Sequence, residues 1–228
     1  MAHIAVRGSA SRTVAPERGT VHLAVTVTAD ARADALASAQ RAHGTVVALA
    51  KDAVDAGTAT AWTAPGVHAW AFQDWAPVPA GRGAPGQSEP VTRFRAGGDV
   101  QVTFAAADGI AELVAALGDV EHVDVQRVEW DLTAETRAAL LRELRTEASR
   151  DAVARGTDYA EALGLGEPRV LGLYEEGLHP GLGGPGEAPA PRLLAKAMTA
   201  DAGGGGFELR PRDIEITAAV TAELDAPD

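Results

Sequence analysis

Residues 133–177 read TAETRAALLRELRTEASRDAVARGTDYAEALGLGEPRVLGLYEEG, and the other segments are interpreted around them. The pattern predicts one long helix followed directly by a buried strand, Arg169–Tyr174. Thr133 is a suitable N-cap, and Gly164 and Pro168 end the helix. A helix with this many small residues must lie closely on a broad surface, and a β-sheet is its natural partner. The predicted packing face of the helix consists of Leu141, Leu144, Ala148, Ala152, Gly156, Tyr159 and Leu163.

Alternating patterns predict strands in much of the remaining chain. Residues 21–27 alternate apolar with polar or small side chains, and so do residues 214–224. A period of two is typical of a half-buried strand. Two further helical patterns cover residues 36–54 and 110–117. We expect Asp30 to cap the first of these helices and Gly57 to end it.

Glycine, proline and shifts of phase predict local irregularities in the strands. We expect a bend at Gly8 and bulges at Pro65–Gly66 and Gly97–Gly98. The apolar alternation also slips by one residue near Gln126 and Arg127, which predicts a further bulge.

These elements follow the order β-β-α-β-β-α-β-α-β-β. The order predicts the α+β class, with a largely antiparallel sheet and about three helices packed on one face. The 228 residues suffice for a single domain over residues 1–228 with a real core. Two Pro/Gly-rich segments, 76–90 and 178–206, are interpreted as flexible loops.

The composition excludes several classes of function. A net charge of −12 argues against nucleic acid as a partner, because an acidic surface repels phosphate. The absence of cysteine excludes disulfides, thiol catalysis and thiolate metal sites. No apolar run is long enough for a membrane span, and the first residues carry no signal-peptide pattern. We therefore expect a cytoplasmic protein, or a periplasmic or secreted one if an export signal was removed.

The clearest candidate surface is a group of aromatic residues in a chain with only 4% aromatics. Trp62, Trp70, Phe72 and Trp75 are predicted to lie on one strand and its exit. They either pack one face of the core or form an exposed ledge at an oligomer interface, where tryptophan is enriched. Trp70, Phe72 and Trp75 are the interface candidates.

Charged residues offer weaker candidates. Asp151 and Arg155 are spaced for an i,i+4 pair, and Glu147 and Arg150 for an i,i+3 pair. Asp151 and Arg155 are interpreted as a solvated structural pair, with a ligand clamp as the alternative.

The titratable residues show no pattern that predicts catalysis. His122 and Asp124, two apart on a predicted strand face, are too few for a metal site, so no metal is predicted. Adjacent Glu175 and Glu176 would face opposite ways on a strand. The glycine runs lack the Lys-Ser/Thr of a phosphate loop. No catalytic residue and no cofactor is predicted.

The ordered set of patterns resembles the SIMPL-domain family, a domain of unknown function that includes periplasmic immunogenic proteins. The resemblance implies self-association into homo-oligomers, loose links to stress defence and signalling, and no accepted catalytic residues. The segments that carry it are Ile4–Ser9, Ala15–Glu17, Val21–Val27, Phe94–Ala96, Val128–Leu132, Ala148–Ala152 with Arg155, Ala162–Gly164, Arg169–Leu171, Arg192–Met198 and Ile214–Thr217.

Three hypotheses for the function follow from the sequence. The leading one is a non-enzymatic, self-associating domain that uses its sheet edges and aromatic strand as contacts. The alternative is a small-molecule or peptide-binding module in which the segments 76–90 and 178–206 act as lids. A hydrolase would require two titratable groups brought together in a pocket.

Overall fold

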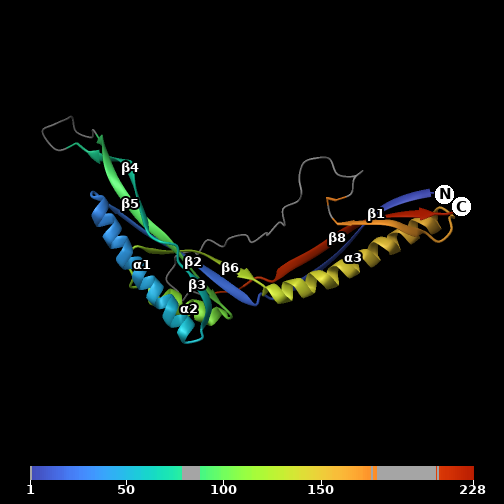
Figure 1. Cartoon of the computed structure of the whole chain (residues 1–228), viewed down its shortest axis with the longest axis horizontal. Helices are drawn as coiled ribbons and strands as arrows, with labels where there is room; N and C mark the ends of the chain where they lie inside the picture. The colour runs from blue at the N-terminus through green and yellow to red at the C-terminus, as the bar shows by residue number, and fades with distance from the viewer. Residues whose placement is uncertain (1, 79–87, 176, 179–208, 210) are drawn as a thin grey trace. The chain divides into compact units, whose positions relative to one another are not determined.

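The computed structural model describes residues 2–78, 88–175, 177–178, 209 and 211–228. These residues form eight strands and three helices, and the α+β class and antiparallel pairing are confirmed (Figure 1). The elements are β1 (Ala2–Val14), β2 (Arg18–Ala29), α1 (Arg32–Asp55), β3 (Ala59–Thr63), β4 (His68–Pro77), β5 (Ser88–Phe104), α2 (Ala107–Leu117), β6 (Val123–Asp131), α3 (Ala134–Ala162), β7 (Arg169–Glu175) and β8 (Ile214–Ala226).

The chain divides into two compact units, each with its own sheet. The α3 unit comprises Met1–Pro16, Leu132–Ala195 and Arg212–Asp228, and its strands run in the order β1-β8-β7. The α1–α2 unit comprises Glu17–Asp131 and Lys196–Pro211, and its sheet has the order β3-β5-β2-β6 with β4 also paired to β5. The three helices are therefore divided between two sheets.

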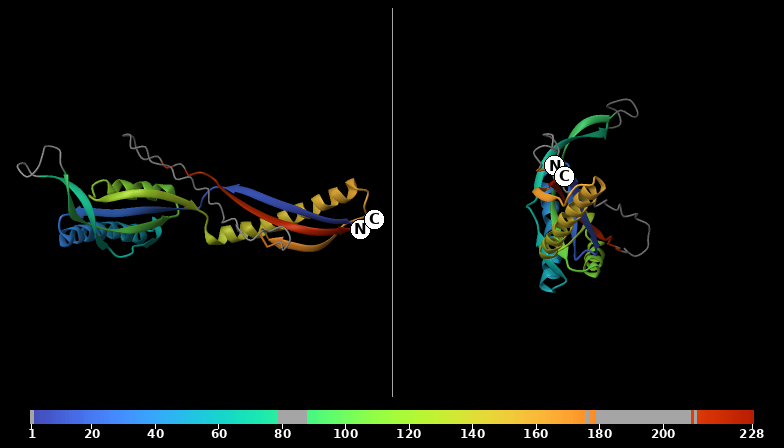
Figure 2. Two further views of the ribbon diagram at one scale, coloured as in Figure 1. Left: turned by 90° about the horizontal axis from the view of Figure 1, so that it is seen from above. Right: turned by 90° about the vertical axis from the view of Figure 1, so that its right-hand side faces the viewer.

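In the α3 unit, α3 lies along β1 and β8 (Figure 2). Thr133 caps the helix as predicted, because its hydroxyl oxygen accepts the Thr136 backbone N–H at 3.2 Å. The predicted packing face is correct for the middle of the helix, but it is wrong for the C-terminal end. Tyr159 and Leu163 are exposed, and the residues that α3 buries are Leu144, Ala148, Ala152, Gly156 and Ala160.

Gly8 does not bend β1, contrary to the prediction. The strand pairs with β8 in unbroken register from Ala2 to Val14. Gly8 instead lies where the helix backbone crosses the strand. A Cβ at this position would overlap the carbonyl oxygen of Ala148 and stand 2.5 Å from the backbone nitrogen of Ala152. The glycine is required by the close approach of helix and sheet.

In the α1–α2 unit, both helices cover the same face of the five-stranded sheet. The predicted alternation of β2 is confirmed, because Val21, Leu23, Val25 and Val27 are all buried under the helices. The bulge in β6 is also confirmed. His22 pairs with Arg127 and Leu23 with Val125, which leaves Gln126 as the extra residue.

The other predicted bulges are absent from the pairing of the described strands. Pro65 and Gly66 separate β3 from β4, so the structure has one strand more than the predicted order. Gly97 and Gly98 pair in unbroken register with β2, and a Cβ at Gly97 would overlap the carbonyl oxygen of Val25. These two glycines therefore accommodate close backbone contact within a regular ladder.

The predicted ends of α1 are half right. Gly57 follows the helix with a φ of 75°, as expected for a C′ glycine. Asp30 does not cap the helix, because the N-cap is Ala31 and the Asp30 carboxylate pairs with Arg93.

The two predicted loops fall mainly outside the described residues. The ends of the 76–90 segment belong to strands: residues 76–77 to β4 and residues 88–90 to β5. Residues 79–87 and 179–206 lie outside the description. Among the helices that are described, none combines the length and the apolar character needed to cross a membrane.

Candidate interaction surfaces

The four predicted aromatic residues lie on two strands rather than one. Trp62 is on β3, half-buried against the core, with the Lys51 ammonium 5.6 Å from its ring centroid. Trp70, Phe72 and Trp75 are on β4. Strand alternation places Trp70 and Phe72 on one face and Trp75 on the opposite face. Trp70 is 41% exposed and Trp75 is 69% exposed.

His68, Trp70, Phe72 and Arg95 form a continuous group that we name the aromatic face. The rings of His68 and Trp70 are stacked with centroids 5.0 Å apart. The Arg95 guanidinium lies 4.7 Å from the centroid of Phe72, a cation–π distance. This face lies on the side of the β4–β5 ladder opposite Ala69 and Phe94, which pack on the helix-covered core.

Arg93 and the two carboxylates that it contacts, Asp30 and Asp74, lie beside the aromatic face, and we name this group the charged fork. Arg93 donates to the Asp30 carboxylate at 2.9 Å and to the Asp74 carboxylate at 3.4 Å, and both contacts raise the pKa of Arg93. Asp74 also accepts the backbone N–H of Trp75 at 2.9 Å. That hydrogen bond, followed by the one from Arg93, lowers the pKa of Asp74. The fork joins both strands of the ladder to the end of β2.

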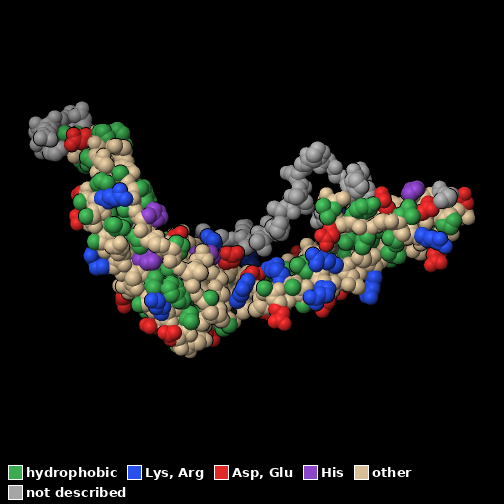
Figure 3. Space-filling model, in the orientation of Figure 1, with side chains coloured by type: hydrophobic (Ala, Val, Ile, Leu, Met, Phe, Trp, Pro, Cys, Tyr) green, Lys and Arg blue, Asp and Glu red, His purple; other side chains and the backbone are tan. Residues whose placement is uncertain are grey.

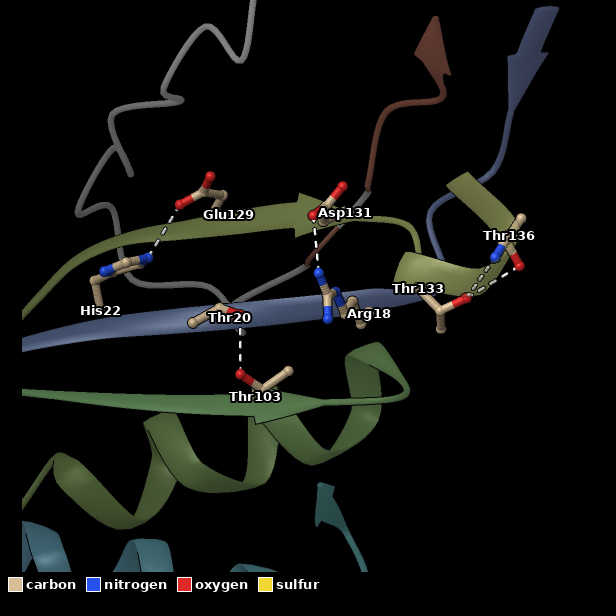
Figure 4. A network of polar contacts seen from close by, with 8 residues as sticks. All are labelled: Arg18, Thr20, His22, Thr103, Glu129, Asp131, Thr133 and Thr136. Carbon is tan, nitrogen blue, oxygen red and sulfur yellow. Dashed lines mark hydrogen bonds and ion pairs between the residues drawn. The ribbon is translucent and has the colours of Figure 1, made fainter. Parts of the chain in front are cut away.

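Three further polar pairs on this sheet face join neighbouring strands (Figure 4). The pairs point along the sheet surface, each to its own partner, rather than toward one shared centre. They are Arg18–Asp131 at 3.0 Å, His22–Glu129 at 3.2 Å and Thr20–Thr103 at 3.0 Å.

The predicted Asp151–Arg155 pair is present, with a nitrogen–oxygen distance of 3.0 Å. The Asp151 carboxylate also accepts the backbone N–H of Ser9 at 2.9 Å, which joins α3 to β1. The Ser9 hydrogen bond and then Arg155 lower the pKa of Asp151. The pair thus has a structural partner that the spacing could not reveal. A ligand role for it stays a prediction.

Other charged side chains of α3 also reach β1. Glu147, which spacing paired with Arg150, pairs with Arg12 at 2.7 Å. The same guanidinium donates to Glu143 at 2.6 Å. β1 therefore carries a row of charge-assisted contacts from the helix beside it.

Replacing Asp151 by asparagine is expected to destabilise the protein at neutral pH and to have little effect in acid. The folded-state pKa of Asp151 lies below its unfolded value, so the unfolded chain takes up the proton first as pH falls. The contribution is therefore complete above an unfolded pKa of about 4 and is lost as pH falls through the folded pKa. Urea unfolding of both proteins across this range measures it.

Arg155→Met is the matched control for this pH series. It removes the ion pair and leaves the larger contribution, the Ser9 hydrogen bond, in place. Its effect should be the smaller one at neutral pH. A stability difference for D151N that stays constant from neutral pH into acid would contradict the assignment.

Strand β7 was predicted to be buried, and this prediction is wrong. Val170, Leu171 and Leu173 are 49%, 57% and 50% exposed. The reason is the position of the helix, because α3 packs on β1 and β8 and β7 is the outer strand. No sequence signal distinguishes a buried apolar strand from an exposed one at a sheet edge.

The polar residues at the end of β7 are held within the same unit. The Tyr174 hydroxyl donates to the Glu223 carboxylate at 3.3 Å, and that negative charge raises the pKa of Tyr174. Glu175 lies 3.4 Å from Arg145 of α3. Glu176, the other half of the adjacent carboxylates, lies outside the described residues.

The other titratable candidates do not converge. His122 lies before β6 in the left-handed region, with a φ of 66°, and both it and Asp124 are exposed. In the parts of the chain that the structure describes, no three His, Asp or Glu side chains come together as a metal site.

A surface cavity of about 370 Å³ lies between α1 and the segment joining β3 to β4. Its lining includes Val47, Val67 and Trp62, and also Gly44, where an added Cβ would meet no atom within 4 Å. His43 lines it, and its buried Nε2 atom has no hydrogen-bond partner among the described residues. Sequence reasoning missed this site, because His43 fits equally well into the apolar stripe of a helix.

The fold and these surfaces define a class: an antiparallel α+β protein in which helices cover one face of each sheet and strand edges carry exposed apolar groups. The chain belongs to the SIMPL family, described as proteins of unknown function (DUF541), whose sequence model matches residues 4–224. The match spans nearly the whole chain and confirms the resemblance. A search of curated proteins found no match.

Proposed function

We propose that this SIMPL-family protein has a non-enzymatic role and works as a homo-oligomer. One observation carries the proposal. Every exposed large apolar side chain on a described strand belongs to a strand at the edge of its sheet. These residues are Trp70 and Trp75 on β4, Val125 on β6, and Val170, Leu171 and Leu173 on β7.

Exposed edges of this kind favour association. An edge strand presents unpaired backbone N–H and C=O groups, and monomeric proteins usually protect it with charge or cover. Covering the apolar side chains of such an edge with a second chain removes them from water and lowers the free energy of the complex. The interface candidates Trp70, Phe72 and Trp75 remain part of this proposal, with Trp75 on the opposite face from the other two.

The described charged side chains support a role other than catalysis. Several of them are engaged in cross-strand and helix–strand pairs, such as Arg93–Asp74 and Arg12–Glu147. A link to stress defence or signalling enters the proposal through the family resemblance alone.

Sedimentation velocity over a wide range of protein concentration tests the proposal. We expect a mass that is a multiple of the chain mass and that falls on dilution. A protein that stays monomeric at the highest concentration would overturn the homo-oligomer.

A second candidate function, small-molecule binding, is supported by the cavity beside His43. A cavity lined by Val47, Val67 and the Trp62 indole suits a small aromatic molecule. The proposed lids, 76–90 and 178–206, do not enter this argument.

Thermal-shift titration with benzamide and benzoate tests this second candidate. Binding to the folded state alone would raise the melting temperature with ligand concentration. Gly44→Leu, which adds a large side chain to the lining of the cavity, should abolish the shift. A shift that persists in this variant would place binding elsewhere, and no shift with either compound would count against the candidate.

A further inference from the structure

One stripe of helix α1 lines the cavity between this helix and the segment that joins β3 to β4. Gln40, His43, Gly44 and Val47 all belong to the lining. Their spacing of three and four residues places them on one side of the helix. Lys51, four residues after Val47, continues the same stripe. In Figure 3, hydrophobic side chains gather along α1, and basic side chains lie at the margin of that group.

The ammonium group of Lys51 lies close to a lining residue of the cavity. It is 5.6 Å from the centroid of the Trp62 ring, a cation–π distance. Trp62 lines the cavity and pairs with the buried Val102 in the β3–β5 ladder, so its position is fixed by the sheet. Lys51 is exposed, and an incoming anion can therefore reach its ammonium group.

No carboxylate neutralises Lys51 in the part of the chain that the structure describes. Its one contact there is the Trp62 ring, and Asp55, one helical turn further along α1, makes no ion pair with it. Arg12 and Arg93, by contrast, each contact two carboxylates. An uncompensated positive charge beside a cavity attracts anions to it, even in a chain with a net charge of −12.

The cavity and the charge together select one class of ligand. The volume of about 370 Å³ lies in the range of small-molecule sites, and the Val47 and Val67 side chains and the Trp62 indole suit a planar ring. A carboxylate attached to that ring could accept a charge-assisted hydrogen bond from the Lys51 ammonium. A positively charged ring substituent would be repelled there.

We infer that this cavity binds a small aromatic carboxylate, with its ring against Trp62 and its carboxylate at the Lys51 ammonium. The inference rests on the second candidate function, small-molecule binding, and names the chemical class of the ligand. Lys51 supplies the preference for a negative charge, and the apolar lining supplies the preference for a ring.

Benzoate and benzamide test this preference, because they have nearly the same shape and differ in charge. Ligand-observed NMR titration of the full-length protein measures both dissociation constants. We expect the constant for benzoate to be lower by about fivefold or more, since only benzoate offers a charged acceptor. Lys51→Met keeps an unbranched apolar stem and removes the ammonium, so it should raise the benzoate constant to about that of benzamide.

Arg41→Met is the matched control. It removes one positive charge from the same helix, but Arg41 is not a lining residue and its guanidinium donates to the Ser38 hydroxyl at 2.9 Å. At physiological salt this variant should keep the benzoate constant within about twofold of the wild-type value, because distant exposed charges are screened. Equal weakening in both variants would show a response to net charge and would overturn the Lys51 contact. Circular dichroism confirms that each variant is folded.

The outcomes separate this inference from the function on which it rests. Binding of neither compound overturns both. Equal binding of benzoate and benzamide to the wild-type protein supports the small-molecule function and overturns only the carboxylate preference. A preference for benzoate that persists in Lys51→Met overturns the assignment of that preference to Lys51.

Discussion

Replacing Gly8 by alanine is expected to destabilise the α3 unit by roughly 3 kcal/mol or more, at the upper end of overpacking effects. The added Cβ would overlap the Ala148 carbonyl oxygen and stand 2.5 Å from the Ala152 backbone nitrogen. Both atoms belong to the helix backbone, so no change of side-chain rotamer can relieve the clash. The helix must move away from β1, which also weakens the hydrogen bond between Ser9 and Asp151.

The distribution of aromatic residues allows this loss to be assigned to one unit. All four tryptophans lie in Glu17–Asp131, whereas Tyr159 and Tyr174, the two tyrosines, lie in the α3 unit. Far-UV circular dichroism reports on α3 together with the other helices, and tryptophan fluorescence reports on the α1–α2 unit. We expect Gly8→Ala to lower the transition seen by circular dichroism and to leave the fluorescence transition nearly unchanged.

Gly44→Ala is the matched control. Gly44 lies inside helix α1, and a Cβ there meets no atom within 4 Å. Alanine at this position should stabilise the protein by about 0.5–1 kcal/mol, because it lowers the backbone entropy of the unfolded chain. Destabilisation of similar size at both glycines would contradict the packing explanation for Gly8.

The elements with strong periodicity could be predicted from the sequence because their own residues determine them. The 29-residue α3, with Thr133 at its start, and strands β2 and β8 are examples. The sheet to which each strand belongs could not be predicted. Alternation shows that a strand has a buried face but not which strand lies beside it. β8 pairs with β1, from the opposite end of the chain.

The misassigned residues have related physical causes. Tyr159 and Leu163 continue the helical spacing, but Ala160 is the residue buried near the end of the helix. Asp30 has the right chemistry for a cap, yet its carboxylate is taken by Arg93, 63 residues further along the chain. In each case a contact from a distant segment overrides the local pattern.

The candidate surfaces were predictable to the extent that they depend on residue type and spacing. The aromatic group was found because tryptophan is rare in this chain, and an alternation of two correctly puts Trp70 and Phe72 on one face. The bond from Asp151 to the Ser9 backbone and the cavity at His43 depend on how helices lie on sheets. Exposure of β7 depends on its place at the edge, which no residue within the strand specifies.

Replacing Phe104 by alanine is expected to lower the free energy of unfolding of the α1–α2 unit by about 3–5 kcal/mol. Phe104 is fully buried at the end of β5, opposite Gly19 of β2 and Ala59 of β3. A Cβ on Gly109 of α2 would stand 2.8 Å from the Phe104 ring, so the ring fills the space directly beneath that helix. Its removal leaves a cavity that the helix and the three strands can close only in part.

Phe72→Ala, the same substitution on the aromatic face, separates cavity formation from the loss of an aromatic ring. Phe72 is half-buried, and its ring contact is the Arg95 guanidinium, a contact worth about 0.5–1 kcal/mol at an exposed site. Tryptophan fluorescence during urea unfolding measures both variants in the same unit. The Phe104 variant should unfold at much lower urea, and the Phe72 variant close to wild type. A Phe104 variant that loses no more stability than the Phe72 variant would contradict the packing role assigned to Phe104.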